Sequence, residues 1–417
     1  MFIEFLEKFR LNEKPETLFP MENESNNTTV IQSTKIKNKN ISVYINEFWT
    51  AKQRQASNLH EISYRACFKP QLPKFFISNL TKEKDYVYDP FLGRGTTIIE
   101  AGLLNRQVIG NDINPLSKIL SEPRFLIPNL NNLQNYLNDI SFGKGQKADI
   151  DLSMFYHPDT ESEIVSLRNY ILQKEENNNL NDMDKWIRMV ATNRLTGHSK
   201  GFFSVYTMPP NQAVSPKRQI KINEKREQKP EYRNVKELIL RKSKTLLKNI
   251  TTIQQKRLKD IHKTAMFLNN DARKTKDIPD NFVQLTVTSP PFLDVVQYAQ
   301  DNWLRGWFNG IDIENIEKKI TMSKTIEQWT TVMQSVFDEL YRITKHNGYV
   351  AFEVGEVKKG KIKLDEYVVP LGINSGFKVI GIIINEQEFT KTANIWGIKN
   401  NNKGTNSNRI VLFKKEN

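Results

Sequence analysis

The chain has 417 residues and a formal net charge of +14, from 61 lysines and arginines against 47 aspartates and glutamates. This length allows two or three domains with a sizeable core, and the charge indicates a polyanionic partner, of which nucleic acid is the simplest. The single cysteine, Cys67, excludes an internal disulfide and a cysteine-rich zinc site, and we expect no bound metal. No long apolar run predicts a membrane helix or a secretory signal, so we expect a cytoplasmic protein.

The first 60 residues carry few clear signals. Residues 23–39 are polar, rich in asparagine and without periodicity, which predicts a loop or an arm. Residues 41–54 are expected to form a short strand and then a helix. We therefore treat residues 1–60 as an N-terminal arm.

The first clear strand runs into a glycine-rich turn. Residues 86–88 are a β-rich triplet that leads into Asp89 and then into the turn from Gly93 to Gly95. The apolar content of residues 96–104 predicts a buried helix directly after this turn. A strand that turns sharply into a helix leaves backbone N–H groups and room for a ligand. The pattern therefore predicts a ligand-binding loop, although a structural tight turn has the same pattern.

A second short strand, at residues 107–111, ends at Asp112. Its spacing from Gly95 is that at which a carboxylate can bind the hydroxyl groups of a ribose. Dinucleotide-binding enzymes of other classes use a similar arrangement, so these features alone leave the kind of enzyme open.

The segment between Asp112 and Asp271 is too long for one crossover between adjacent strands. It must therefore fold as a domain or subdomain. Residues 159–189 within it have the pattern of amphipathic helix.

This inserted segment is also strongly basic. Residues 193–203 and 206–212 mix basic, amide and aromatic groups, and from Lys217 to Lys248 there are twelve lysines and arginines against four glutamates. Such density is typical of contacts with nucleic-acid phosphates, although a charge run more often marks a solvated helix face.

A proline motif, Ser289-Pro290-Pro291-Phe292, follows a strand-like run at residues 281–287. Ligand chemistry in open α/β sheets lies at the carboxyl ends of the strands. The motif is therefore a candidate for the reacting part of a site.

The motif suits methylation of an exocyclic base amine, whose lone pair is delocalised into the ring, so that acceptors must pull on its hydrogens. The two prolines remove N–H donors and fix the backbone, which lets the Ser289 hydroxyl and a carbonyl of Ser289 or Pro290 act as acceptors. Phe292 offers a ring face for a flipped base. Taken alone, the motif also fits a Pro-Pro loop with an ordinary core phenylalanine.

The C-terminal part adds a helix and a hairpin. Residues 302–308 predict a helix on which Trp303 and Trp307 lie one turn apart, which indicates core packing rather than base contact. Residues 377–384 and 409–413 predict a final hairpin joined by a long polar loop.

Together, the glycine loop and the proline motif resemble those of the S-adenosylmethionine-dependent DNA amino-methyltransferases, over most of residues 61–417. The resemblance implies a doubly wound, Rossmann-like α/β methyltransferase sheet with S-adenosylmethionine at its carboxyl edge. It also implies that Asp112 binds the ribose, that Asp271 contacts the adenine ring, and that residues 352–357 form a later strand and glycine turn. The candidate cofactor-binding residues are Phe68, Lys69, Asp89, Phe91, Gly93, Gly95, Thr96, Asp112 and Asp271, and the candidate catalytic residues are Ser289, Pro290, Pro291 and Phe292.

The Ser-Pro-Pro-aromatic form is typical of cytosine N4 enzymes, whereas adenine N6 enzymes usually carry Asp or Asn in place of Ser289. We therefore expect methylation of cytosine N4 in double-stranded DNA. Adenine N6 methylation, an RNA substrate and a non-catalytic DNA-binding specificity subunit are the alternatives. No cysteine accompanies the motif, so we expect direct transfer without the covalent intermediate of cytosine C5 enzymes.

The order of the motifs departs from the commonest one for cytosine N4 enzymes, because here the cofactor loop precedes the proline motif. The resemblance divides the chain into a cofactor-binding part (61–120), an inserted target-recognition region (121–265) and a catalytic part (266–417). It also implies a role as the modification half of a restriction–modification system, beside a separate endonuclease. The candidate DNA contacts are Arg194, His198, Lys200, Lys217, Arg218, Lys221 and Arg226.

Overall fold

The computed structural model describes residues 2–11, 28–50, 56–65, 67–209, 213–291, 298–320, 323, 325–357, 362–386 and 407–417. Among these residues, no helix is both long enough and apolar enough to cross a membrane.

A nine-stranded sheet forms the centre of the fold. In spatial order its strands are β1 (Val30–Ile36), β2 (Lys39–Asn46), β10 (Lys378–Glu386), β11 (Ser407–Lys414), β7 (Thr344–Val354), β6 (Val283–Thr288), β3 (Tyr86–Asp89), β4 (Gln107–Asn111) and β5 (Met266–Leu268). The last five run parallel. The chain passes outward from β3 to β4 and β5 and then returns to β6 on the other side of β3. The strand order therefore reverses between β3 and β6, where open α/β sheets bind ligands.

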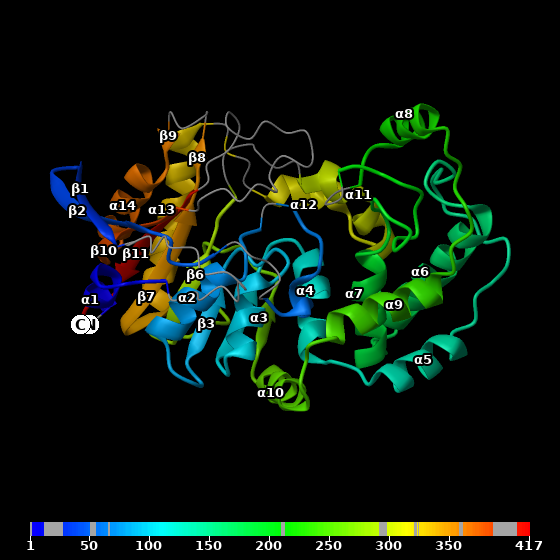
Figure 1. The fold of residues 1–417 in the computed structure, drawn as a ribbon, viewed down its shortest axis with the longest axis horizontal. Helices are drawn as coiled ribbons and strands as arrows, with labels where there is room; N and C mark the ends of the chain where they lie inside the picture. Colours follow the sequence, from blue (N-terminus) through cyan, green and yellow to red (C-terminus); the bar gives the residue numbers. More distant parts are fainter. Residues whose placement is uncertain are drawn as a thin grey trace, which may run out of the picture.

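Helices cover both faces of this sheet (Figure 1). On one face, α2 (Gln71–Leu80) and α3 (Thr96–Leu103) share a core with Val87 of β3. On the other face, α13 (Ile326–Ile343) and α14 (Asp365–Asn374) share a second core with Tyr88, the next residue of the same strand. Because successive strand residues point to opposite faces, β3 is buried on both sides. The predicted doubly wound α/β sheet is confirmed.

The predicted final hairpin is confirmed, since β10 and β11 pair antiparallel. The prediction of a loop or arm for residues 23–39 is wrong from Val30 onward. There β1 and β2 form a hairpin whose turn has positive φ at Lys37 and Asn38, and β2 joins the sheet parallel to β10. The strand was missed because β1 is an edge strand, largely exposed and therefore polar. The short strand expected within residues 41–54 is confirmed as part of β2. Of the helix expected after that strand, residues 47–50 are not helical, and residues 51–54 lie outside the described residues.

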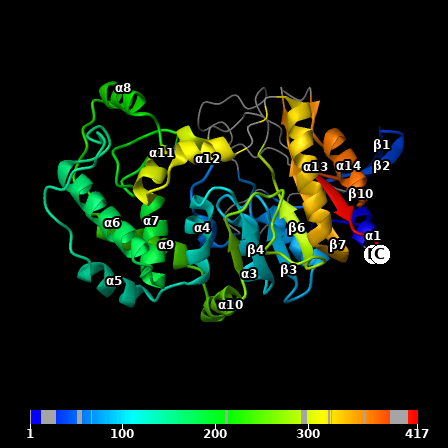
Figure 2. The same cartoon turned by 180° about the vertical axis from the view of Figure 1, so that it is seen from behind.

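The segment between β4 and β5 is helical and lies beside the sheet (Figures 1 and 2). The amphipathic helix pattern of residues 159–189 is confirmed, as two helices, α6 and α7. Trp186 of α7 and Leu246 of α9 belong to the same core as Val87 of the sheet. The helices of this segment are α4 (Leu116–Ser121), α5 (Leu130–Asp139), α6 (Pro158–Glu176), α7 (Asp182–Thr192), α8 (Pro216–Arg226), α9 (Val235–Leu247) and α10 (Thr252–His262), with a short 3-10 helix, η3 (Glu122–Phe125).

After β6, α11 (Tyr298–Asn309) and α12 (Ile313–Lys319) lie between the sheet and this helical region. Trp303 and Trp307 of α11 are partly buried against the main core, as predicted. Both views place the two ends of the chain side by side, near α1 (Figures 1 and 2). The remaining elements are α1 (Phe2–Glu7), the 3-10 helix η2 (Asn58–His60), and a small sheet of β8 (Glu356–Val357) and β9 (Ile362–Lys363).

Candidate active site

A pocket enclosing about 1150 Å³, part of it open to solvent, lies at the carboxyl ends of β3, β4, β5 and β6. Each of the four strands contributes predicted site residues to its wall. These residues are Phe91 and Gly93 from the glycine loop, Asp112 after β4, Asp271 after β5, and Ser289, Pro290 and Pro291 after β6. Parts of the two sequence motifs that are far apart along the chain therefore meet in one cavity.

The glycine loop is fixed to the strand that carries the proline motif. Asp89 is buried, and its Oδ1 accepts hydrogen bonds from Thr288 Oγ1 at 2.7 Å and from the Phe91 amide at 3.2 Å. Thr97 Oγ1 donates to the Val287 carbonyl at 3.0 Å. Burial raises the pKa of Asp89 to about 7, with Thr288 and Phe91 opposing that rise. Asp89 therefore supports the loop from behind and is not part of the pocket wall.

The two glycines of the loop have left-handed backbone conformations, with φ of +51° at Gly93 and +78° at Gly95. A Cβ atom at Gly95 would also come within 2.7 Å of the Ser121 Cβ. The turn therefore requires glycine at both positions.

Asp112 presents its carboxylate to the pocket from a fixed position. Its Oδ2 accepts from the Gly93 amide and its Oδ1 from the Asn114 amide, both at 2.9 Å. Burial raises the pKa of Asp112, and these amide donors oppose that rise. The acid that follows β4 is thus bound directly to the glycine loop that follows β3.

Asn111, which the sequence did not single out, joins this acid to the next loop. Its Oδ1 accepts from the Asn270 amide at 2.9 Å and its Nδ2 donates to the Asn270 carbonyl at 3.0 Å. The side chain is fully buried and pairs with the backbone as a neighbouring strand would. It holds the loop with Asp271 beside Asp112.

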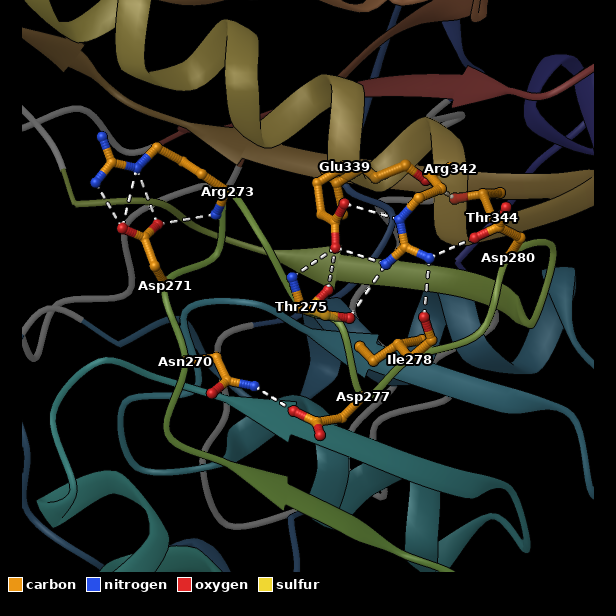
Figure 3. Close-up of polar contacts among 11 residues, drawn as sticks. Asn270, Asp271, Arg273, Thr275, Asp277, Ile278, Asp280, Glu339, Arg342 and Thr344 are labelled. Carbon is orange, nitrogen blue, oxygen red and sulfur yellow. Dashed lines mark hydrogen bonds and ion pairs between the residues drawn. The ribbon is translucent and has the colours of Figure 1, made fainter.

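Asp271 forms an ion pair with Arg273, which also lines the pocket (Figure 3). The guanidinium Nε donates to both carboxylate oxygens at 2.9 and 3.0 Å, and Nη2 donates at 2.5 Å. The hydrogen bond from Arg273 lowers the pKa of Asp271. The carboxylate is therefore ionised at neutral pH, and a ligand that uses it must share it with Arg273.

Ser289 hydrogen-bonds to Glu353 of β7, which is consistent with the parallel register that pairs Thr288 with Phe352. Burial raises the pKa of Glu353, opposed by Ser289 and by Asn408, whose Nδ2 donates to Glu353 Oε1 at 2.7 Å. Glu353 lies in the strand predicted at residues 352–357, but nothing in the sequence assigned it to the site. Phe292 lies outside the described residues.

Five predicted cofactor-binding residues are not in the pocket wall: Phe68, Lys69, Asp89, Gly95 and Thr96. Phe68 packs against the main core, and its carbonyl accepts from Arg94 Nη2 at 3.5 Å. Arg94 Nε also donates to Thr96 Oγ1 at 3.1 Å. These contacts fix the outer side of the glycine loop. Tyr64, which the sequence did not indicate, lines the pocket instead.

The predicted DNA contacts fall into two groups. Arg194 is 8% exposed and stacks on Phe202, with its guanidinium carbon 3.9 Å from the ring centroid. Burial lowers the pKa of Arg194 to about 10, so its position is that of a structural residue. The other six are exposed: His198, Lys200, Lys217, Arg218, Lys221 and Arg226.

His198 and Lys200 line a second hollow in the helical region, and Arg226 stacks on Tyr206 at 3.9 Å. Within the described parts of the chain, no group of three or more His, Cys, Asp or Glu side chains could hold a metal ion.

A sequence model of the family described as DNA methylase matches residues 3–120. The chain is 26% identical over 311 residues to the type II methyltransferase M.BsoBI of Geobacillus stearothermophilus, covering 66% of this chain and 57% of that protein. It is 25% identical over 301 residues to the type II methyltransferase M.MvaI of Kocuria varians, covering 65% and 60%. The chain thus spans about six tenths of the length of these curated relatives.

Among solved structures, a SAM-dependent methyltransferase from Methanosarcina mazei is 10% identical, with a TM-score of 0.32, over 82% of this chain and 97% of that chain. The matches in sequence confirm the resemblance to DNA methyltransferases that the two motifs predicted.

Proposed function

We propose that the protein transfers a methyl group from S-adenosylmethionine to an exocyclic amine in double-stranded DNA, and that the amine is N4 of cytosine. The observation that carries this proposal is that one pocket contains the acids after β4 and β5 together with the Ser-Pro-Pro motif after β6. The relatives named as type II methyltransferases support the same reaction class.

The pocket has the groups that S-adenosylmethionine requires. Asp112 accepts hydrogen bonds from the ribose hydroxyls. Asp271 lines the same pocket as Val332, Met333 and Val336, whose apolar side chains suit the adenine ring. When bound, the cofactor supplies a methyl group on a positively charged sulfur. The glycine loop holds its methionine end.

The protein's own residues then prepare the amine. The Ser289 hydroxyl donates its hydrogen to Glu353, which leaves the oxygen lone pairs free to accept a hydrogen from the amine. The carbonyl before Pro290 is a second acceptor, and neither Pro290 nor Pro291 presents a competing N–H. Catalysis by this site consists of positioning and electrostatic stabilisation.

We further propose that residues 121–265 form the target-recognition region and that the six exposed candidates contact DNA. Extrusion of a base from the duplex costs roughly a few kcal/mol of free energy. The phosphate contacts of these residues offset that cost. The protein would act in the cytoplasm as the modification half of a restriction–modification system, beside a separate endonuclease.

The experiment that tests this proposal is incubation of the protein with labelled S-adenosylmethionine and mixed-sequence duplex DNA, followed by mass spectrometry of the released nucleosides. Label in N4-methylcytosine is the expected result, and label in N6-methyladenine would refute the choice of base. Cofactor binding without any methylated base would favour an RNA substrate or a non-catalytic specificity subunit.

A matched pair of variants ties the result to the pocket. Asp112→Ala should abolish cofactor binding, whereas Asp139→Ala, at an exposed position of α5, should bind and methylate as the unchanged protein does. Unchanged cofactor binding in Asp112→Ala would show that the pocket is not where the cofactor binds.

A further inference from the structure

One helix, α13, contacts both the loop of the proline motif and the loop that carries Asp271. Its first turn reaches the end of the proline motif, its middle lines the pocket, and its last turns hold the loop that carries Asp271. We propose that α13 is a positioning element that sets the catalytic loop through Trp329 and the cofactor-binding loop through Glu339 and Arg342. This inference rests on the proposed function and adds positioning residues to it.

Trp329 fixes the proline motif from one side. Its side chain is 2% exposed, and its Nε1 donates to the Pro291 carbonyl at 3.0 Å. Proline has no N–H, so the Pro290-Pro291 pair cannot be held by donors of its own. The indole supplies the missing donor and fixes the direction of the Pro291 carbonyl. The restricted φ angles of the two prolines carry this constraint back to the carbonyls of Ser289 and Pro290. Because the ring also lines the pocket, loop and wall are held by one side chain.

At the other end of α13, Glu339 and Arg342 form hydrogen bonds with the loop that follows Asp271 (Figure 3). Glu339 Oε1 accepts from both the amide and the hydroxyl of Thr275, each at 2.6 Å. Arg342 donates to the carbonyls of Thr275 at 3.1 Å and Ile278 at 3.0 Å. The loop backbone is therefore bound at several points in succession.

Glu339 and Arg342 also form a two-point ion pair with each other. Arg342 Nη2 lies 2.7 Å from Glu339 Oε1, and Arg342 Nε lies 2.9 Å from Glu339 Oε2. Burial alone would raise the pKa of Glu339, but hydrogen bonds from Arg342 and Thr275 bring it below its usual value. Glu339 is thus an ionised acceptor, and a charged acceptor binds the Thr275 donors more strongly than a neutral one.

Between these two ends, the helix contributes Val332, Met333 and Val336 to the pocket wall. Trp329 and Glu339 are about 15 Å apart along the helix axis at the usual rise per residue. A single rigid element therefore sets the distance between the reacting loop and the acid that binds the cofactor. The two ends should affect different steps of the reaction.

Loss of the indole N–H should impair turnover more than binding. Trp329→Phe keeps the aromatic ring in the wall and removes the donor to Pro291. We expect methyl transfer at saturating cofactor to fall by about tenfold to a hundredfold, with cofactor affinity nearly unchanged. Trp329→His, which keeps a ring N–H, should recover part of the lost turnover.

Loss of the carboxylate should have the opposite effect. Glu339→Gln weakens the hold on Thr275, so we expect the dissociation constant of S-adenosylhomocysteine to rise by about tenfold with turnover at saturating cofactor largely kept. If this variant does not fold, Arg342→Lys serves the same purpose, because lysine keeps the charge but not the forked donors to Thr275 and Ile278.

The experiment measures S-adenosylhomocysteine binding by calorimetry and single-turnover methylation of duplex DNA for each variant. Trp186→Phe is the matched control for the indole. It removes a buried hydrogen bond, from Trp186 Nε1 to Ser243 Oγ at 2.9 Å, in a part of the protein that does not line the pocket. Glu175→Gln is the control for the carboxylate, since it alters a forked pair with Arg188 in the helical region.

The inference is overturned if the α13 variants behave as their controls do, or if both α13 ends change binding and turnover alike. Failure of the unchanged protein itself to bind the cofactor product and to methylate DNA would instead refute the proposed function, and the inference with it. The two failures are therefore distinguishable from the same set of measurements.

Discussion

Asp89 couples the stability of the fold to pH. It is buried behind the glycine loop, and burial raises its pKa to about 7 from a usual value of 3.8. The folded protein therefore holds this proton more tightly than the unfolded chain does. Its contribution to stability is greatest below about pH 4, declines as the pH rises, and is fully lost above about pH 7.

Asp89→Asn should remove this pH dependence, because the amide keeps an acceptor for Thr288 but does not ionise. We expect the free energy of unfolding of the unchanged protein to fall relative to the variant between pH 5 and pH 8, by about 3 kcal/mol for a shift of this size. Urea unfolding at several pH values measures it. Asp139→Asn, at an exposed site, is the control, and parallel curves for Asp89→Asn and the unchanged protein would contradict the expectation.

At the residue scale, the sequence allowed us to predict site residues that directly follow strands, because the carboxyl ends of parallel strands meet at one edge of the sheet. Asp112, Asp271 and Ser289 were found in this way and line one pocket. Asn111 and Glu353 were not, because each acts on a partner distant in the sequence and only the three-dimensional pairing of strands reveals it.

At the scale of elements, α8 is held by one face and exposes the other. The buried Gln219 donates to the Tyr206 carbonyl at 3.0 Å, and Asn223 donates to the Met154 carbonyl at 2.8 Å. Lys217, Arg218 and Lys221 are exposed on the same helix. A helix anchored by amides and basic on its free side is suited to contact phosphates without reading bases.

Replacing Lys217, Arg218 and Lys221 together by alanine should weaken binding to duplex DNA of any sequence. It should also reduce the slope of log affinity against log salt by about 0.9 for each phosphate that is no longer neutralised, and so by up to about three. Fluorescence anisotropy at several salt concentrations measures both effects.

A control with the same change of charge is available on α10, which both views place at the opposite side of the molecule from α8. The exposed Lys256 and Lys259 of α10, and the exposed Lys263 that follows its last residue, can be replaced by alanine in the same way. Equal weakening in both triple variants would mean that only net charge matters and that α8 does not bind DNA.

Helices and turns were predicted correctly where the sequence carries a local signal. The glycine turn and the helical run at residues 159–189 were found because local composition and periodicity mark them. The division of that run into α6 and α7 was not predicted, although an Asn181–Asp184 capping box marks the start of α7. The edge strand β1 was missed because a strand paired on one side only needs no apolar alternation. Its pairing depends on β2, which is itself placed by the distant β10.

At the scale of the whole molecule, the helical region and the sheet share one core. Ile187 of α7 is fully buried in the same cluster as Val87 of β3 and Ile99 of α3. The inserted segment is therefore packed onto the central sheet and is not joined to it by a linker alone. Because a shared core is disrupted as a whole, the two parts should unfold together.

Ile187→Ala should destabilise the whole protein by about 2–5 kcal/mol, the usual cost of removing a large buried aliphatic side chain. Hydrogen exchange should show that the amides of β3 and β4 lose protection together with those of α7. If α7 alone became unprotected while the strands kept their protection, the insertion would be an independently unfolding unit.

The two ends of the chain lie side by side, and the N-terminal strand β2 pairs directly with the C-terminal strand β10. The fold can therefore be regarded as a closed ring of elements that is cut at one point. A circular permutant with joined ends, opened at the exposed residues Lys248 and Asn249 between α9 and α10, would keep every strand in place. In that chain the proline motif would precede the glycine loop, which is the commoner order among cytosine N4 enzymes. The order of the two motifs along the chain thus depends on where the ring is cut, whereas the arrangement of the site in space does not.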